Sequence, residues 1–342
     1  MLQCRNNSSR SEHAAGIPVD LTSRTSETHA APIPQAGLAL AIFSLGNLLP
    51  SMLPEPWWTP VHIVCAGFGL VFLVPVLGRH LHAIRNSNVR RSLVFDYCNP
   101  LIAPLTTTVP MAIITLGTYL IRFGHAGLLG ARILWWIGAA TIALLMGYLL
   151  WRFVMHGFQL ENVCPAWLVG FVGILVAAVT SGMVRLPWAG RVIFHVGFVI
   201  DIVMLMLIST RIAWFGLPDA IRPTMAIYTA PVSLLVASYT STYPRHNPLF
   251  MLMLITCAQL LFAFAVILLP WMLAAPVSPA WAAFTFPMVI TATALRNALD
   301  VLAQEGWLIP AWFQWLQIGE TALACSLVVA VAIIFIRHPW KR

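Results

Sequence analysis

Charged side chains are scarce in this sequence. Asp, Glu, Lys and Arg make up 9% of the 342 residues, whereas a soluble globular domain carries about 25%. Apolar residues make up 60%. Apolar runs of about 20 residues, each long enough to cross the hydrocarbon core of a bilayer, recur from end to end. The composition therefore predicts an all-α, polytopic membrane protein and argues against a soluble domain with one anchor.

Acidic residues are few and scattered, which argues against an enzyme. The 11 Asp and Glu residues form no cluster, whereas a membrane-embedded transferase needs an acidic motif such as DDxxD to hold Mg²⁺. No span has a Ser-His-Asp arrangement or metal-spaced histidines, and the six cysteines form no CxxC. No basic run is interleaved with aromatics, so nucleic acid is not an expected partner. We expect no catalytic residue, no cofactor and no metal site.

The chain divides into two short tails and one large membrane domain. Residues 1–31 are polar and lack the apolar core of a secretory signal, so they are predicted to be a disordered tail. Residues 32–337 form the membrane domain, and 338–342 a short basic tail. Within the membrane domain we predict ten spans. They fall near 34–53, 58–78, 100–122, 131–153, 165–184, 190–211, 223–243, 248–274, 280–299 and 309–336.

The distribution of Lys and Arg predicts the orientation. With ten spans both termini lie on one side, and that side holds 13 of the 19 basic residues. Cytoplasmic loops carry the excess of Lys and Arg, so both termini are predicted to be cytoplasmic, with a bacterial inner membrane as the expected location. The basic stretch 79–99 is predicted to be a long loop between the second and third spans.

The third, fifth, seventh and ninth spans share small residues, hydroxyls and a central helix breaker, whereas the first span has Pro34 at its start and no breaker in its middle. The breakers follow one another at steps of 60, 61 and 56 residues, which is typical of stacked copies of one helical hairpin. They are Pro110, Gly170, Pro231 and Pro287. Hydroxyls on the same spans can line a wet path, and the candidates are Thr107, Thr180, Ser233, Thr285 and Thr291.

This repeat predicts five helical hairpins around an axis. The odd helices form an inner ring that lines a pore, and the even helices form an outer ring. The alternative is a generic helical bundle whose prolines are ordinary membrane kinks. In the third span both Pro104 and Pro110 are present, so either one can make the kink.

The ninth span, Trp281 to Ala294, is central to this interpretation. Pro287 removes a backbone donor near its middle, and lipid tolerates such a break only where protein or water satisfies the freed groups. Phe286, directly before the proline, is placed to lie across a cavity. Arg296 is about 15 Å further along the helix and is a candidate charge for a pore mouth.

Several segments resemble the tellurite-resistance/dicarboxylate transporter family, which includes bacterial TehA, fungal malate and sulfite transporters and plant guard-cell slow anion channels. With the ten-span layout, the resemblance covers roughly 32–337. The matching segments are Ile33–Ala41, Asn99–Pro104, Arg222–Ala226 with Ala230-Pro231, and Trp281–Pro287.

The resemblance implies a homotrimer in which each protomer has its own pore. It also implies a phenylalanine gate on the ninth helix, which falls on Phe286 in Thr285-Phe286-Pro287, with Phe284 as the alternative. The function that it implies is passage of small inorganic or organic anions through a gated pore. Gly170 is a departure, because many relatives have a proline in that span.

Two isolated carboxyls lie within predicted spans. An intramembrane carboxyl is a functional candidate by default, and Asp201 and Glu320 are such residues. Each has two open roles, an inter-helix hydrogen bond or proton coupling. Proton coupling defines the alternative function, a carrier or exporter of C4-dicarboxylate, sulfite or tellurite-type oxyanions.

Overall fold

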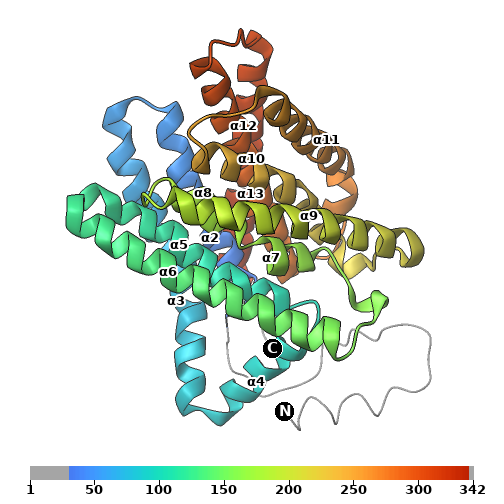
Figure 1. The fold of residues 1–342 in the computed structure, drawn as a ribbon. Helices are drawn as coiled ribbons and strands as arrows, with labels where there is room; N and C mark the ends of the chain where they lie inside the picture. Colours follow the sequence, from blue (N-terminus) through green and yellow to red (C-terminus); the bar gives the residue numbers. More distant parts are fainter. Residues whose placement is uncertain (1–30, 339–342) are drawn as a thin grey trace.

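The computed structural model describes residues 31–338, and all of their regular elements are helical (Figure 1). The predicted tails 1–31 and 338–342 therefore lie outside the described residues, except for Ala31 and His338.

Eight helical segments of the described chain are long and apolar enough to cross a membrane. They are Gln35–Met52, Glu55–Arg85, Ala103–Met155, Pro187–Phe215, Asp219–Thr242, Pro248–Leu273, Pro279–Gln304 and Ala311–Arg337. This finding confirms an all-α, multi-pass membrane protein.

The count of eight differs from the predicted ten at two places. The 53-residue segment Ala103–Met155 contains two helices, α5 (Thr108–Thr118) and α6 (Gly124–Leu149), which pack against each other. The chain turns between them where Gly124 adopts a positive φ of 71°, a conformation that glycine reaches without a Cβ clash. In the predicted span 165–184, α7 (Ala166–Val172) and α8 (Leu175–Ser181) have only seven residues each.

Five buried segments pack in a closed cycle. α2 (Gln35–Leu48) contacts α5, α5 contacts α8, α8 contacts α10 (Ala230–Thr242), α10 contacts α12 (Phe286–Gln304), and α12 contacts α2. All five belong to odd-numbered predicted spans. Burial agrees with an inner position, since 67% of the α2 window and 83% of the Asp219–Thr242 window are buried.

Five long helices cover this cycle from outside (Figure 1). Each packs on the inner element that precedes it in the chain. They are α3 (Trp58–Arg85), α6, α9 (Pro187–Phe215), α11 (Pro248–Leu273) and α13 (Ala311–Arg337). Large apolar side chains remain exposed on them, for example Leu144 at 76% and Ile267 at 76%. Such a surface is unfavourable in water and stable against lipid tails.

Side-chain hydrogen bonds tie neighbours in the cycle together. Asn47 of α2 donates to Thr118 of α5 (3.0 Å), and the Tyr119 hydroxyl after α5 donates to the Phe43 carbonyl of α2 (2.6 Å). On the other side of the cycle, the hydroxyls of Ser233 of α10 and Thr291 of α12 lie 3.1 Å apart. The inner elements are therefore held by polar contacts as well as by apolar packing.

The predicted long loop 79–99 is helical instead. α3 continues to Arg85, and α4 (Ser87–Cys98) turns back from its end (Figure 1). Asn86 caps α4, because its side-chain oxygen accepts from the amides of Asn88 and Val89. Arg79 and Asp96 join the two helices through a buried ion pair of 2.8 Å. The basic residues of this stretch suggested an exposed loop, but Arg79 is buried and pairs with Asp96 inside the protein.

Removal of one member of this pair is expected to destabilise the protein strongly. Arg79→Met leaves the Asp96 carboxylate buried beside an apolar side chain, which costs about 3–5 kcal/mol. The double variant Arg79→Met/Asp96→Asn carries no such charge and is expected to recover much of the loss. Melting temperatures of the purified proteins in detergent measure both effects. A double variant that melts below the single variant would contradict this account.

Candidate permeation path

Interruptions divide four of the inner segments into two short helical pieces. The second pieces begin at Thr108, Leu175, Ala230 and Phe286, and three of them follow a 3₁₀ segment. These 3₁₀ segments are η4 (Ala103–Thr107), η8 (Asp219–Thr229) and η9 (Pro279–Phe284). The helices of the third, fifth, seventh and ninth predicted spans are thus each interrupted in the structure.

A threonine stands directly before the second helix at three of these interruptions. Each hydroxyl donates to the carbonyl three residues earlier: Thr107 to Pro104 (2.7 Å), Thr229 to Ala226 (3.1 Å) and Thr285 to Ala282 (2.7 Å). A carbonyl left unpaired inside a bilayer costs several kcal/mol. Each hydroxyl therefore adds a side-chain hydrogen bond at its interruption, and at Thr285 it supplements the backbone amide that donates to the same carbonyl at 3.2 Å.

The prolines begin the second helices and do not kink a continuous one. Pro231 and Pro287 are the second residues of α10 and α12, and Pro110 is the third residue of α5. Proline is tolerated in the first turn of a helix, where its missing donor is not needed. The junction in the third span lies between Pro104, in η4, and Pro110. Pro104 thus lies at the start of η4, and Pro110 lies in the first turn of α5.

Gly170 is not the interruption of the fifth span, and this prediction is corrected. α7 continues through Gly170 to Val172, and the helix breaks at Gly173 and Ile174. A Cβ at position 170 would meet the Leu149 side chain at 2.7 Å and the Pro104 ring at 2.8 Å. Gly170 is therefore required for close packing of the fifth span on the third.

The predicted hydroxyls are buried in the walls between helices. Thr107, Ser233, Thr285 and Thr291 have no exposed surface, and Thr180 has 4%. Each donates to protein: Thr180 to the Val176 carbonyl (2.9 Å), Ser233 to the Thr229 carbonyl (2.6 Å) and Thr291 to the Pro287 carbonyl (2.9 Å). Their protons are used within the fold, so their role as lining residues stays a prediction.

The two candidate gate residues differ in exposure. Phe284 is fully buried, and its ring packs edge-on against Trp281, with 5.5 Å between ring centroids. Phe286 is partly exposed although Thr285 and Pro287 on either side of it are buried. Of the two phenylalanines, only Phe286 is therefore partly exposed.

Partly exposed residues form one face on α12 and one on α5. Phe286, Thr293, Asn297 and Asp300 recur at helical spacing on α12. On the third span the corresponding face is entirely apolar and was not identified from the sequence. Its residues are Leu105, Val109, Ile113, Leu116 and Leu120. Because both elements belong to the inner cycle, these faces are candidate walls of a path.

Arg296, the predicted vestibule charge, is paired. Its guanidinium lies 3.0 Å from the Asp300 carboxylate one turn further along α12. Both side chains are partly exposed, so the ion pair is solvent-screened. The net charge that Arg296 adds to a pore mouth is smaller than the sequence alone predicts.

A family model described as SLAC1, voltage-dependent anion channel, matches residues 33–338. The chain belongs to the voltage-dependent anion channel family. Anion transport across a membrane, rather than catalysis, is therefore its general function, and the resemblance inferred from the sequence is confirmed. Among curated proteins, no sequence matches this chain.

Within this anion-channel fold, both intramembrane carboxyls lie on outer helices and face inward. Asp201 is 1% exposed and Glu320 is 2% exposed. Neither oxygen of Asp201 and neither oxygen of Glu320 has a partner at hydrogen-bond geometry among the described residues, although the Gln259 amide of α11 lies near Glu320.

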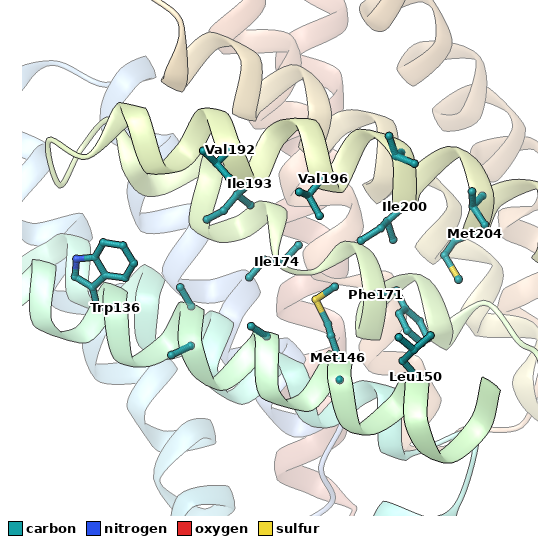
Figure 2. Close-up of a pocket in the computed structure, with 16 residues that line it drawn as sticks. Trp136, Met146, Leu150, Phe171, Ile174, Val192, Ile193, Val196, Ile200 and Met204 are labelled. Atoms are coloured by element: carbon teal, nitrogen blue, oxygen red, sulfur yellow. The ribbon is translucent and has the colours of Figure 1, made fainter. Parts of the chain in front are cut away.

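A separate apolar groove of about 650 Å³ lies between α6 and α9 of the channel (Figure 2). Met146 and Leu150 of α6 and Val196 and Ile200 of α9 line its sides. Its lining also includes Ile174, at the interruption between α7 and α8. The apolar lining and the position between two outer helices match lipid tails and not a path for ions.

The junction hydroxyls are expected to be structural. Thr285→Val keeps the shape of the side chain but removes the hydroxyl bond to the Ala282 carbonyl, which then keeps only the bond from the Thr285 amide (3.2 Å), so the expected cost is about 0.5–1.5 kcal/mol. Thr285→Ser keeps the donor and is expected to retain most of the stability. The melting temperatures of the two purified variants test this difference. Equal stability of the valine variant and the wild type would show that this hydrogen bond is dispensable.

Proposed function

We propose that this chain conducts small anions through the middle of the inner cycle and that the Phe286 ring closes the path. The observation that carries the gate assignment is the partial exposure of Phe286 at the start of α12, beside a fully buried Phe284. The membership in an anion-channel family supports the choice of anions.

The architecture that we propose has ten membrane helices arranged as five hairpins. The closed cycle of α2, α5, α8, α10 and α12 supports the inner ring, and the long outer helices support the second ring. In this arrangement α5 and α6 cross the membrane separately, and α7 with α8 forms one interrupted span. We further propose cytoplasmic termini, a location in the cell membrane, and a homotrimer with one pore in each protomer.

Weak binding along the path favours conduction. A permeating ion must be attracted enough to enter and held weakly enough to leave. The apolar face of α5 offers no fixed charge. The amino-terminal ends of α5, α10 and α12 begin inside the predicted spans, and such helix ends carry partial positive charge that attracts anions. These helix ends replace the hydroxyls as the main attractive groups in our proposal.

A proton-coupled carrier is the second candidate function. It is favoured by the buried, unpartnered Asp201, since such carboxyls serve in proton relays of membrane proteins. The two candidates differ in driving force, because a passive channel follows the membrane potential and a coupled carrier follows the proton gradient.

Smaller side chains at the gate are expected to raise the flux. In liposomes under an imposed potential, Phe286→Ala is expected to pass anions about tenfold faster than the wild type, which corresponds to a barrier lower by about 1.4 kcal/mol. Phe286→Leu is expected to give a smaller increase. Phe284→Leu is the matched control and is expected to keep the wild-type flux, because Phe284 packs inside the protein.

Unchanged flux in Phe286→Ala would refute the gate assignment. Uptake that appears only under an imposed proton gradient, in the wild type and in both Phe286 variants, would favour the carrier over the channel.

A further inference from the structure

Asp201 lies at the middle of α9 on the face that packs against the inner cycle. The buried residues of this helix recur at helical spacing and include Phe194, Gly197, Asp201 and Ile208. The adjacent Ile202 and Val203 are about half exposed, at 46% and 52%, and form part of the lipid-facing surface. The carboxyl is thus screened from lipid and directed toward the neighbouring inner elements.

The register of α9 on α8 places Asp201 beside the interruption of the fifth span. A Cβ at Gly190 would meet Ser181, and a Cβ at Gly197 would meet Leu175, so the two helices run antiparallel. One turn beyond Gly197, Asp201 lies next to the residues that precede Leu175. Figure 2 agrees, since Ile200 points into the groove that Ile174 and Phe171 also line.

Few ionisable groups face this position. α7 and α8 contain no titratable residue, and α10 contributes only Tyr239, which packs on Phe194 at the other end of the contact. η7 (Leu160–Asn162) contributes Glu161, which is exposed.

The ionisable groups of α9 itself are distant. Arg211 lies ten residues away, about 15 Å along the axis, and donates to the Gly216 and Glu161 carbonyls. His195 lies six residues away and contacts the Tyr243 hydroxyl at 2.8 Å. Arg191, one further turn along, is exposed.

A buried carboxylate requires donors or a cation, and neither oxygen of Asp201 has a donor among the described residues. We propose that Asp201 is a proton-binding site whose occupancy sets the packing of the α7–α8 interruption and thereby the conduction of anions. This inference rests on the proposed channel function and adds its regulation.

The cycle that we propose has two states. In the structure described here the proton is bound, and the neutral carboxyl fits its apolar surroundings. Release of the proton to water leaves a charge that must be solvated, so α9 must separate from the interruption far enough to admit water or a backbone donor. Because α8 contacts both α5 and α10, this separation loosens the inner cycle. Conduction therefore rises as the pH rises.

The test measures anion flux in liposomes with the same pH on both sides and a fixed membrane potential. Each pH unit changes the ratio of the two protonation states tenfold, so the wild-type flux is expected to rise about tenfold per pH unit while the protonated form predominates. Asp201→Asn mimics the neutral form and is expected to give the low flux at each pH. Asp201→Glu is expected to keep the pH response.

Glu320→Gln is the matched control, a second buried carboxyl without a hydrogen-bond partner among the described residues, which lies on α13 against α12 and α2 and not against the fifth span. It is expected to keep the pH response of the wild type. A wild-type response that persists in Asp201→Asn, or that is lost equally in Glu320→Gln, would overturn the assignment to Asp201. Higher flux in Phe286→Ala together with either result would leave the channel proposal intact and reject only this inference.

A second readout does not depend on transport. The infrared carbonyl band of a protonated carboxyl is expected to decrease as the pH rises in purified wild-type protein, and this change is expected to be absent in Asp201→Asn. An identical band change in both proteins would also overturn the proposal.

Discussion

An interrupted helix inside a bilayer must satisfy its own backbone, and this requirement governs the inner part of the molecule. Water is absent from the hydrocarbon core, so each carbonyl freed by a break needs a donor from protein. At three breaks Thr107, Thr229 and Thr285 donate a side-chain hydrogen bond to the carbonyl three residues earlier, and at Thr285 this bond adds to a backbone bond to the same oxygen. With these hydrogen bonds in place, each second helix begins inside the membrane domain, and its first amides pair with carbonyls of the preceding turn.

The outer helices complete this arrangement by excluding lipid from the breaks. α3, α6, α9, α11 and α13 each cover an inner element and expose their apolar side chains to the bilayer. The inner elements then need little hydrophobic difference between their faces, because protein surrounds them. Their neighbours are fixed by specific polar contacts, such as Asn47 with Thr118, and by glycines that allow close approach, such as Gly170 against Pro104.

Much of the fold followed from composition and spacing, and the details of the site followed less well. Apolar runs predicted the membrane class, and the repeated breakers predicted which spans are interrupted. Gly170 was misplaced as a break because a glycine needed for packing and a glycine needed for a turn look alike in a sequence. The helical character of 79–99 was missed because the Arg79–Asp96 pair joins residues 17 positions apart. The apolar face of α5 gave no signal, since its leucines and valines look like those that face lipid.

The groove between α6 and α9 extends from the outer helices to the inner ring. Its lining reaches Phe171 and Ile174, which flank the interruption of the fifth span. Lipid tails that fill the groove therefore touch an inner element directly, without an outer helix between them. Through this groove, the acyl-chain composition and lateral pressure of the bilayer are expected to act on the conformation of the ring itself.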